Sequence, residues 1–108
     1  IENVLFDIGF IDSNMGYANI SMSNLRGIFF NNTSIRSGSL QENKVKNINF
    51  KEADLTGTQF FKTSLNGIDL SNSNIDQIAV SLEDIRGAKI NQMQAIDLMY
   101  LLGVKVVE

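Results

Sequence analysis

The 108-residue sequence contains no cysteine, histidine, proline or tryptophan. The absence of cysteine excludes a disulfide framework and thiolate chemistry, and the absence of histidine removes the commonest general base and metal ligand. Neither a run of about 18 apolar residues nor a signal or transit peptide is apparent, so we expect a cytoplasmic protein without membrane association. These absences favour a non-enzymatic protein that holds no metal or cofactor.

The composition is that of one globular domain. Hydrophobic residues make up 44% of the chain, charged residues make up 19%, and the formal net charge is −3. A chain of this length is enough for a single domain. Because the sequence does not begin with methionine, it is compatible with being part of a longer protein.

The strongest signal is a five-residue period, which matches neither the helix period nor the strand period. Every fifth residue from Leu5 to Ile90 is apolar, at eighteen positions in all. If four pentapeptides make one coil, residues twenty apart lie one above another at about 4.8 Å, the spacing of hydrogen-bonded strands. The period therefore predicts an all-β solenoid with four sides, filled by the side chains at multiples of five.

A second column of inward positions stands two residues before the first. Most of its members are small or are isoleucine, and four isoleucines are spaced by twenty: Ile8, Ile28, Ile48 and Ile68. Small residues are expected on the remaining sides, because a narrow interior cannot hold large side chains from all four sides.

Three members of this second column are polar and fall on one side of the coil. They are Asn3, Asn43 and Glu83, with Ser23 and Thr63 between them. We expect an interior polar ladder in which each side chain bonds to the next side chain. Because a buried, unpaired carboxylate is costly, we expect the coil to loosen at Glu83 and let it reach solvent.

The corners of the coil require residues with positive φ, as at the third residue of a type II turn, where glycine fits without strain. Half of the eight glycines lie two residues after a member of the apolar column: Gly27, Gly57, Gly67 and Gly87. Asparagine and aspartate tolerate the same geometry better than most residues. We therefore expect it also at Asp12, Asn32, Asn47 and Asn72.

Three pentapeptides resemble the repeat of the pentapeptide-repeat family, which is roughly Ala-Asp/Asn-Leu-x-x. They are ANISM (18–22), SNLRG (23–27) and ADLTG (53–57). The resemblance covers about residues 3–92 without a break in register. It implies a right-handed quadrilateral β-helix, and the handedness is implied by the resemblance alone.

The five-residue period ends after Ile90, and residues 92–102 have the pattern of a helix. Asn91 can cap this helix, Gln94 would complete a capping box, and Gly103 suits a left-handed stop. We therefore expect a pentapeptide-repeat β-helix over residues 1–91. A C-terminal cap, with a capping α-helix and a short strand, is expected over residues 92–108.

The expected helix carries two apolar stripes at helical spacing. One stripe contains Ala95, Leu98, Met99 and Leu102, and the other contains Met93, Ile96 and Tyr100. Either the helix is well buried in its own chain, or the second stripe joins a second copy, together with the strand-like residues 104–107. The ending from residue 87 to 107 resembles the cap of Qnr-like quinolone-resistance proteins, which implies a homodimer. The expected interface is Met93, Ile96, Tyr100, Val104 and Val106.

No catalytic set is apparent in the sequence. Serine and threonine are frequent, but no histidine can activate them. Asp54, Asp69 and Asp84 directly precede members of the apolar column, where we expect them to bond to backbone turns. No phosphate-binding loop and no metal-ligand cluster is present. The function must therefore come from the surface.

The Qnr-like resemblance implies a protein that binds a bacterial type II topoisomerase, DNA gyrase or topoisomerase IV, as a mimic of duplex DNA, and that protects it from quinolones. Such mimicry requires a dense negative surface and no direct contact with nucleic acid. The candidate acidic surface is Asp7, Asp12, Glu42, Glu52, Asp54, Asp69 and Asp76. Basic residues interrupt this set, so the alternative is a scaffold that mediates other protein–protein interactions.

Overall fold

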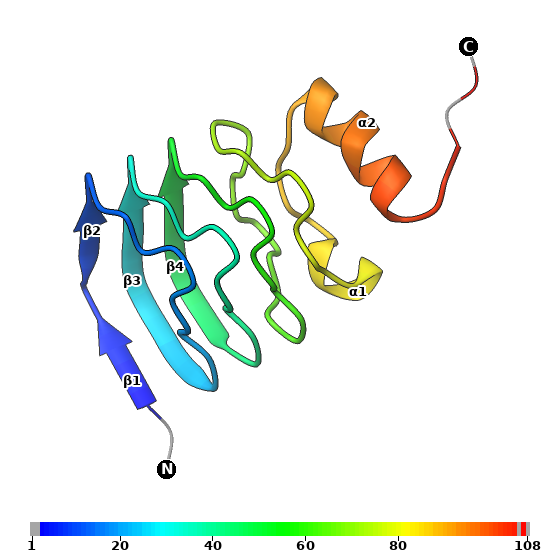
Figure 1. Cartoon of the computed structure of the whole chain (residues 1–108). Helices are drawn as coiled ribbons and strands as arrows, with labels where there is room; N and C mark the ends of the chain where they lie inside the picture. Colours follow the sequence, from blue (N-terminus) through cyan, green and yellow to red (C-terminus); the bar gives the residue numbers. More distant parts are fainter. Residues whose placement is uncertain (1–2, 106, 108) are drawn as a thin grey trace.

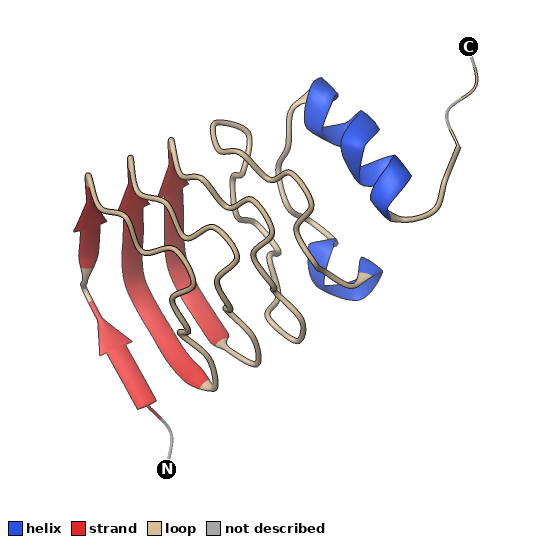
Figure 2. Cartoon of the chain, viewed as in Figure 1, coloured by secondary structure: helices blue, strands red, loops and turns tan. Residues whose placement is uncertain are grey.

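The computed structural model describes residues 3–105 and 107, and its backbone winds through successive coils along the molecule (Figure 1). The elements in chain order are β1 (Asn3–Phe6), β2 (Gly9–Ile11), β3 (Ser23–Asn31), β4 (Lys44–Lys51), α1 (Leu82–Ile85) and α2 (Gln92–Leu101). The strands lie side by side on two adjacent sides of the stack, turns and loops build the other sides, and both helices lie toward the C-terminal end (Figure 2).

Parallel pairing with a shift of twenty residues joins the coils. Leu5 pairs with Leu25 between β1 and β3, and Phe30 pairs with Phe50 between β3 and β4. Isolated parallel bridges outside the named strands keep the same shift. Each coil is therefore twenty residues long, as the period predicts. We number the coils 1 to 5, for residues 3–20, 21–40, 41–60, 61–80 and 81–91.

The side chains at multiples of five fill the interior of the stack, which confirms the central prediction. None of these eighteen residues is exposed, and Leu55 and Leu70 have no accessible surface at all. The rings of Phe10, Phe30 and Phe50 stack with centroids 5.1 and 5.2 Å apart. This interior is a ladder of like side chains in successive coils, and its burial is the main source of stability.

The corners have the predicted backbone geometry at most positions. Fifteen residues at one phase of the period, two residues after a member of the apolar column, have positive φ. At Gly57 the φ is 69°, and the N–H of Thr58 donates to the carbonyl of Leu55 at 3.0 Å, as in a type II turn.

The expectation of positive φ is confirmed at Asp12, Asn32 and Asn47 but is wrong at Asn72. The N–H of Ser73 still donates to the carbonyl of Leu70 at 3.1 Å, so a turn closes there. A type I turn makes the same hydrogen bond with negative φ at both central residues, and asparagine does not require the left-handed region as strongly as glycine does.

The interior polar ladder exists, but its predicted bonding is wrong. The N–H of Ser23 donates to Oδ1 of Asn43 at 2.9 Å, and Nδ2 of Asn43 donates to the carbonyl of Ile20 at 2.7 Å. The N–H of Asn43 in turn donates to Oγ1 of Thr63 at 3.1 Å. The side chains of Asn43 and Thr63 thus bond to backbone groups 20 to 23 residues earlier in the chain, because that backbone carries donors and acceptors that need partners.

The coil loosens at Glu83, as expected, and this residue is exposed. The loosening takes the form of the one-turn helix α1, which the period did not predict. The hydroxyl of Ser81 accepts from the N–H of Asp84 at 3.2 Å and caps this helix. A local helix therefore replaces the pentapeptide corner where an inward glutamate would be unpaired.

Helix α2 has the predicted capping box, in which Asn91 and Gln94 bond reciprocally to each other's backbone. The left-handed stop at Gly103 is also present, with a φ of 82°. Gln94 is buried, and its Nε2 donates to the carbonyls of Leu70 and Ser73 at 2.7 and 2.8 Å. The side chain that closes the capping box thus also joins the helix to coil 4.

Replacing Gln94 with alanine should lower the free energy of unfolding by about 1–3 kcal/mol, because the buried carbonyl of Leu70 and the partly buried carbonyl of Ser73 each lose a donor. Urea denaturation monitored by circular dichroism measures this change. The matched control is Gln92→Ala, in the exposed first turn of the same helix. Equal losses for the two variants would contradict the role of Gln94 in holding α2 on the stack.

Candidate functional site

The candidate acidic residues lie in several separate stacks along the coils. Asp12 and Glu52 share one corner, with Asn32 between them, and Nδ2 of Asn32 donates to Oδ1 of Asp12 at 2.9 Å. Glu42 lies at another corner, where its Oε1 is 3.7 Å from Nζ of Lys62. Asp7 lies at a third corner, the one that Gly27 occupies in the next coil.

Asp54 and Asp69 bond to backbone turns, as expected from their positions in the repeat. Oδ1 of Asp54 accepts from the hydroxyl and the N–H of Thr56 at 2.6 and 3.1 Å. Oδ1 of Asp69 accepts from the hydroxyl and the N–H of Ser71 at 2.6 and 2.9 Å. Asp54 also forms an ion pair with Arg36 at 3.3 Å. Both carboxylates thus serve local structure.

These bonds favour the ionised carboxylates. Partial burial opposes ionisation of Asp54, but the bonds from Thr56 and the charge of Arg36 outweigh it and lower the pKa of Asp54 below its usual value. The hydroxyl and N–H of Ser71 lower the pKa of Asp69 in the same direction. A carboxylate whose pKa is lower in the folded state stabilises the fold above its unfolded pKa, and this contribution is lost as the pH falls through the folded pKa.

The stability of the wild type should therefore fall as the pH drops below about 4, the usual pKa of an aspartate, and Asp54→Asn should reduce this fall. The difference should be about 1 kcal/mol or less, since Asp54 is partly exposed. Asparagine preserves the turn, because Oδ1 of Asn74 accepts an N–H at 2.9 Å at the equivalent position of the next coil. Urea denaturation at a series of pH values measures the effect. Identical pH profiles for the two proteins would contradict it.

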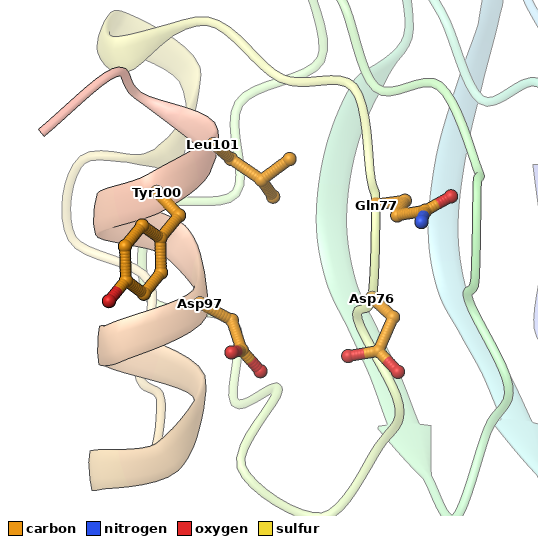
Figure 3. A pocket seen from close by; sticks show the side chains of 5 residues that line it. All are labelled: Asp76, Gln77, Asp97, Tyr100 and Leu101. Atoms are coloured by element: carbon orange, nitrogen blue, oxygen red, sulfur yellow. The ribbon is translucent and has the colours of Figure 1, made fainter. Parts of the chain in front are cut away.

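A groove between α2 and coil 4 contains the remaining acidic candidate. Figure 3 shows Asp76 and Gln77 on one wall and Asp97, Tyr100 and Leu101 on the other. The carboxylates of Asp76 and Asp97 extend into the same space. Sequence reasoning did not single out Asp97, because a helical residue carries no phase of the five-residue period.

The basic residues gather on the two sides of the stack that the strands build, which we call the strand faces (residues 3–11, 23–31, 43–51, 63–71 and 83–91). Six of the nine basic residues lie there: Arg26, Lys44, Lys46, Lys51, Arg86 and Lys89. The acidic candidates Asp12, Glu42, Glu52, Asp54 and Asp76 lie outside the strand faces, whereas Asp7 and Asp69 lie on them. The charge is therefore divided between sides of the molecule, with both signs present.

The expected dimer residues lie on the uncovered side of α2. Met93 is 78% exposed, and Ile96 and Tyr100 are also exposed, whereas Leu98 of the first stripe is buried against the stack. Val104 is exposed as well, and Val106 lies outside the described residues. The expected strand at 104–107 is not observed in the described part of this segment, because no neighbouring strand is present there to pair with it.

At the opposite end, outward positions of coil 1 and of the start of coil 2 also expose apolar side chains. They are Val4, Phe6, Ile11, Tyr17 and Met22. The guanidinium of Arg26 lies 5.7 Å from the centroid of the Phe6 ring, within the range of a cation–π contact. The two ends of the stack thus carry most of the exposed apolar surface.

Among the described residues, no group of three acidic side chains is placed to hold a metal ion, and no helix is long and apolar enough to cross a membrane. The interior is filled and the polar groups are used in turns and ladders. Fold and surface together define a stacked-coil repeat protein whose chemistry lies in its outward side chains.

Comparison with known proteins agrees with this class. Residues 40–77 match the family described as pentapeptide repeats, in eight copies. The same register continues through the coils on both sides of this segment. No curated protein matches the sequence.

Several solved structures resemble the chain in shape. A pentapeptide-repeat protein, Rfr23, from the cyanobacterium Cyanothece 51142 is 14% identical, with a TM-score of 0.41, over 83% of this chain and 85% of the other. QnrB1, described as a plasmid-mediated fluoroquinolone resistance protein, is 12% identical in one trypsin-treated variant, with a TM-score of 0.31, over 97% and 90%. A second QnrB1 variant is 13% identical, with a TM-score of 0.32, over 98% of each chain.

Proposed function

We propose that this protein is a right-handed quadrilateral β-helix that acts as a non-enzymatic scaffold, dimerises through its C-terminal end and binds other proteins through its sides. The observation that carries the proposal is the uncovered apolar stripe of α2, formed by Met93, Ile96 and Tyr100, beside a helix face that already packs on the stack. One stripe is sufficient to cover the last coil. The second stripe therefore remains available for a symmetric contact between two copies.

Light scattering coupled to gel filtration tests the dimer, because the chain has a mass of 12.0 kDa and a dimer has twice that mass. The wild type should be dimeric, and Met93→Asp should be monomeric, since it places a charge within the apolar contact. The matched control is Met22→Asp, an exposed methionine in the second coil that should leave the dimer intact. A monomeric wild type would remove the proposal.

A bacterial type II topoisomerase is a specific candidate partner. The position of five of the seven acidic candidates outside the strand faces supports it, and Asp12 and Glu52 share a corner there. The pairing of Asp54 with Arg36 and of Glu42 with Lys62 weakens the negative field of the same sides. This mixed surface favours the more general scaffold over a DNA mimic.

A gyrase supercoiling assay, with and without a quinolone, separates the two. A DNA mimic should inhibit or protect gyrase at micromolar concentration, and the double variant Asp12→Asn/Glu52→Gln should lose the effect because it removes two charges from one corner. If the wild-type protein neither inhibits nor protects gyrase, the topoisomerase proposal is removed and the scaffold with another partner remains.

A further inference from the structure

The parallel pairing that joins the coils is interrupted along one side of β4. In the regular pattern, the N–H of an apolar-column residue donates to a carbonyl nineteen residues later, as Leu65 does to Asp84 at 2.8 Å. The structure describes all of residues 43–72. Within this range, the N–H groups of Val45 and Phe50 make no such bond to coil 4. Strand β4 pairs with β3 along its other edge. Between Val45 and Phe50, the edge of β4 that faces coil 4 therefore makes no backbone hydrogen bond to coil 4, and we call this stretch the free edge of β4.

A groove of about 560 Å³ lies along this free edge. Its inward-facing residues are Val45, Ile48 and Ile68, and its outward rim includes Asn49 and Asn66. Ile48 is 8% exposed and Ile68 is 7% exposed, the highest values among the buried apolar residues. Val45 is half-buried, whereas the equivalent residues of coils 2 and 4, Leu25 and Leu65, are fully buried. The interior ladder is therefore slightly more accessible to solvent at this joint than in coil 2.

The groove combines two features that an extended peptide uses for binding. The free edge of β4 presents backbone donors and acceptors, which an added strand can pair with in β-augmentation. The apolar floor can receive alternate side chains of that strand, because successive side chains point to opposite sides. The volume is within the range of ordinary ligand sites.

The charge around the groove indicates what kind of peptide fits. Strand β4 carries the exposed Lys46 and Lys51, and the strand faces as a whole hold most of the basic residues. Pairing of two β4 edges from separate copies would bring like charges together, and lysines on an edge strand oppose such self-association. An acidic strand would instead be attracted.

We propose that an acidic segment in extended conformation binds in this groove, adds a strand to the free edge of β4 and places alternate apolar side chains over Val45, Ile48 and Ile68. The inference rests on the proposed scaffold function and specifies one of its binding surfaces. It requires no contribution from α2, so it is independent of the dimer.

The test uses the full-length chain and a fluorescein-labelled octapeptide of alternating glutamate and valine. Fluorescence anisotropy should show saturable binding by the wild type, and this binding should weaken as the salt concentration is raised. The double variant Lys46→Glu/Lys51→Glu should bind the peptide about tenfold more weakly, since both lysines flank the groove. Lys105→Glu, near the C-terminus, is the matched control and should bind as the wild type does. Amide hydrogen exchange should show that Val45 and Phe50 exchange faster than Leu55 in the free protein and become protected by the peptide.

Three results would overturn the proposal. The first is protection of the Val45 and Phe50 amides in the free protein, because the edge would then be paired. The second is equal or tighter binding of a lysine–valine or glutamine–valine octapeptide, or of a single-stranded oligonucleotide. The third is no binding of the acidic peptide. If the peptide fails while the protein remains dimeric and binds a partner elsewhere, only the groove assignment is lost and the scaffold stands.

Discussion

Replacing Phe60 with alanine should lower the free energy of unfolding by about 3–5 kcal/mol, whereas the same change at the adjacent Phe61 should cost about 1 kcal/mol or less. Phe60 is 1% exposed and meets the ring of Phe50 edge-on at 6.4 Å, so truncation leaves a cavity inside coil 3. Phe61 is 42% exposed and lies outside the coil. Urea denaturation of both variants beside the wild type measures the difference.

This pair tests the five-residue period directly, because the two residues have the same chemistry and adjacent positions. A loss of 3–5 kcal/mol is a large part of the 5–15 kcal/mol that usually stabilises a domain, so Phe60→Ala is expected to unfold at a much lower urea concentration than the wild type. Similar losses for both variants, or a larger loss for Phe61→Ala, would contradict the interior assignment.

Two glycine-to-alanine substitutions should change stability in opposite directions. At Gly38 an added Cβ would lie 2.8 Å from the carbonyl oxygen of Ile35 and 2.9 Å from that of Ala18. Both are backbone atoms that cannot move without shifting a coil, so Gly38→Ala should cost about 1–3 kcal/mol. At Gly16 the nearest atom would be Oδ1 of Asn14 at 3.4 Å, an ordinary contact.

Gly16→Ala should therefore stabilise the protein by about 0.4–1 kcal/mol, because alanine restricts the unfolded chain more than glycine does. Thermal and urea denaturation of the two variants, measured side by side, check the signs. Neither position has positive φ, so the contrast comes from the space around each Cβ. Destabilisation of the same size at both sites would contradict the packing described for the inward side of coil 2.

The interior could be predicted from the sequence because its rule is simple. A residue such as Leu55 must face inward if every fifth position does, and glycines at one phase of the period mark the corners. The capping box of α2 was also predictable, since Asn91 and Gln94 have the spacing of a known motif. Each of these features depends on residues close together in the sequence or on one repeating period.

The features that could not be predicted depend on how neighbouring coils meet. The bonding of Asn43 to the backbone of coil 1 and the burial of Gln94 under two carbonyls require knowledge of the opposing backbone. The free edge of β4 gives no sequence signal, because Val45 continues the apolar column without a break. The number of charged residues could be counted from the sequence. Their distribution between the strand faces and the other sides becomes apparent only when residues twenty apart are placed one above another.

The interrupted pairing beside β4 also has a consequence for how the stack unfolds. Coils 3 and 4 remain joined on the other sides, for example by the bridge between Asp54 and Asn74, so their connection has fewer hydrogen bonds than any connection within coils 1–3. In a repeat stack, cooperativity is transmitted only through contacts between neighbours. We therefore expect coils 1–3 to be the more stable part of the stack, with coils 4 and 5 and α2 able to open while coils 1–3 remain intact.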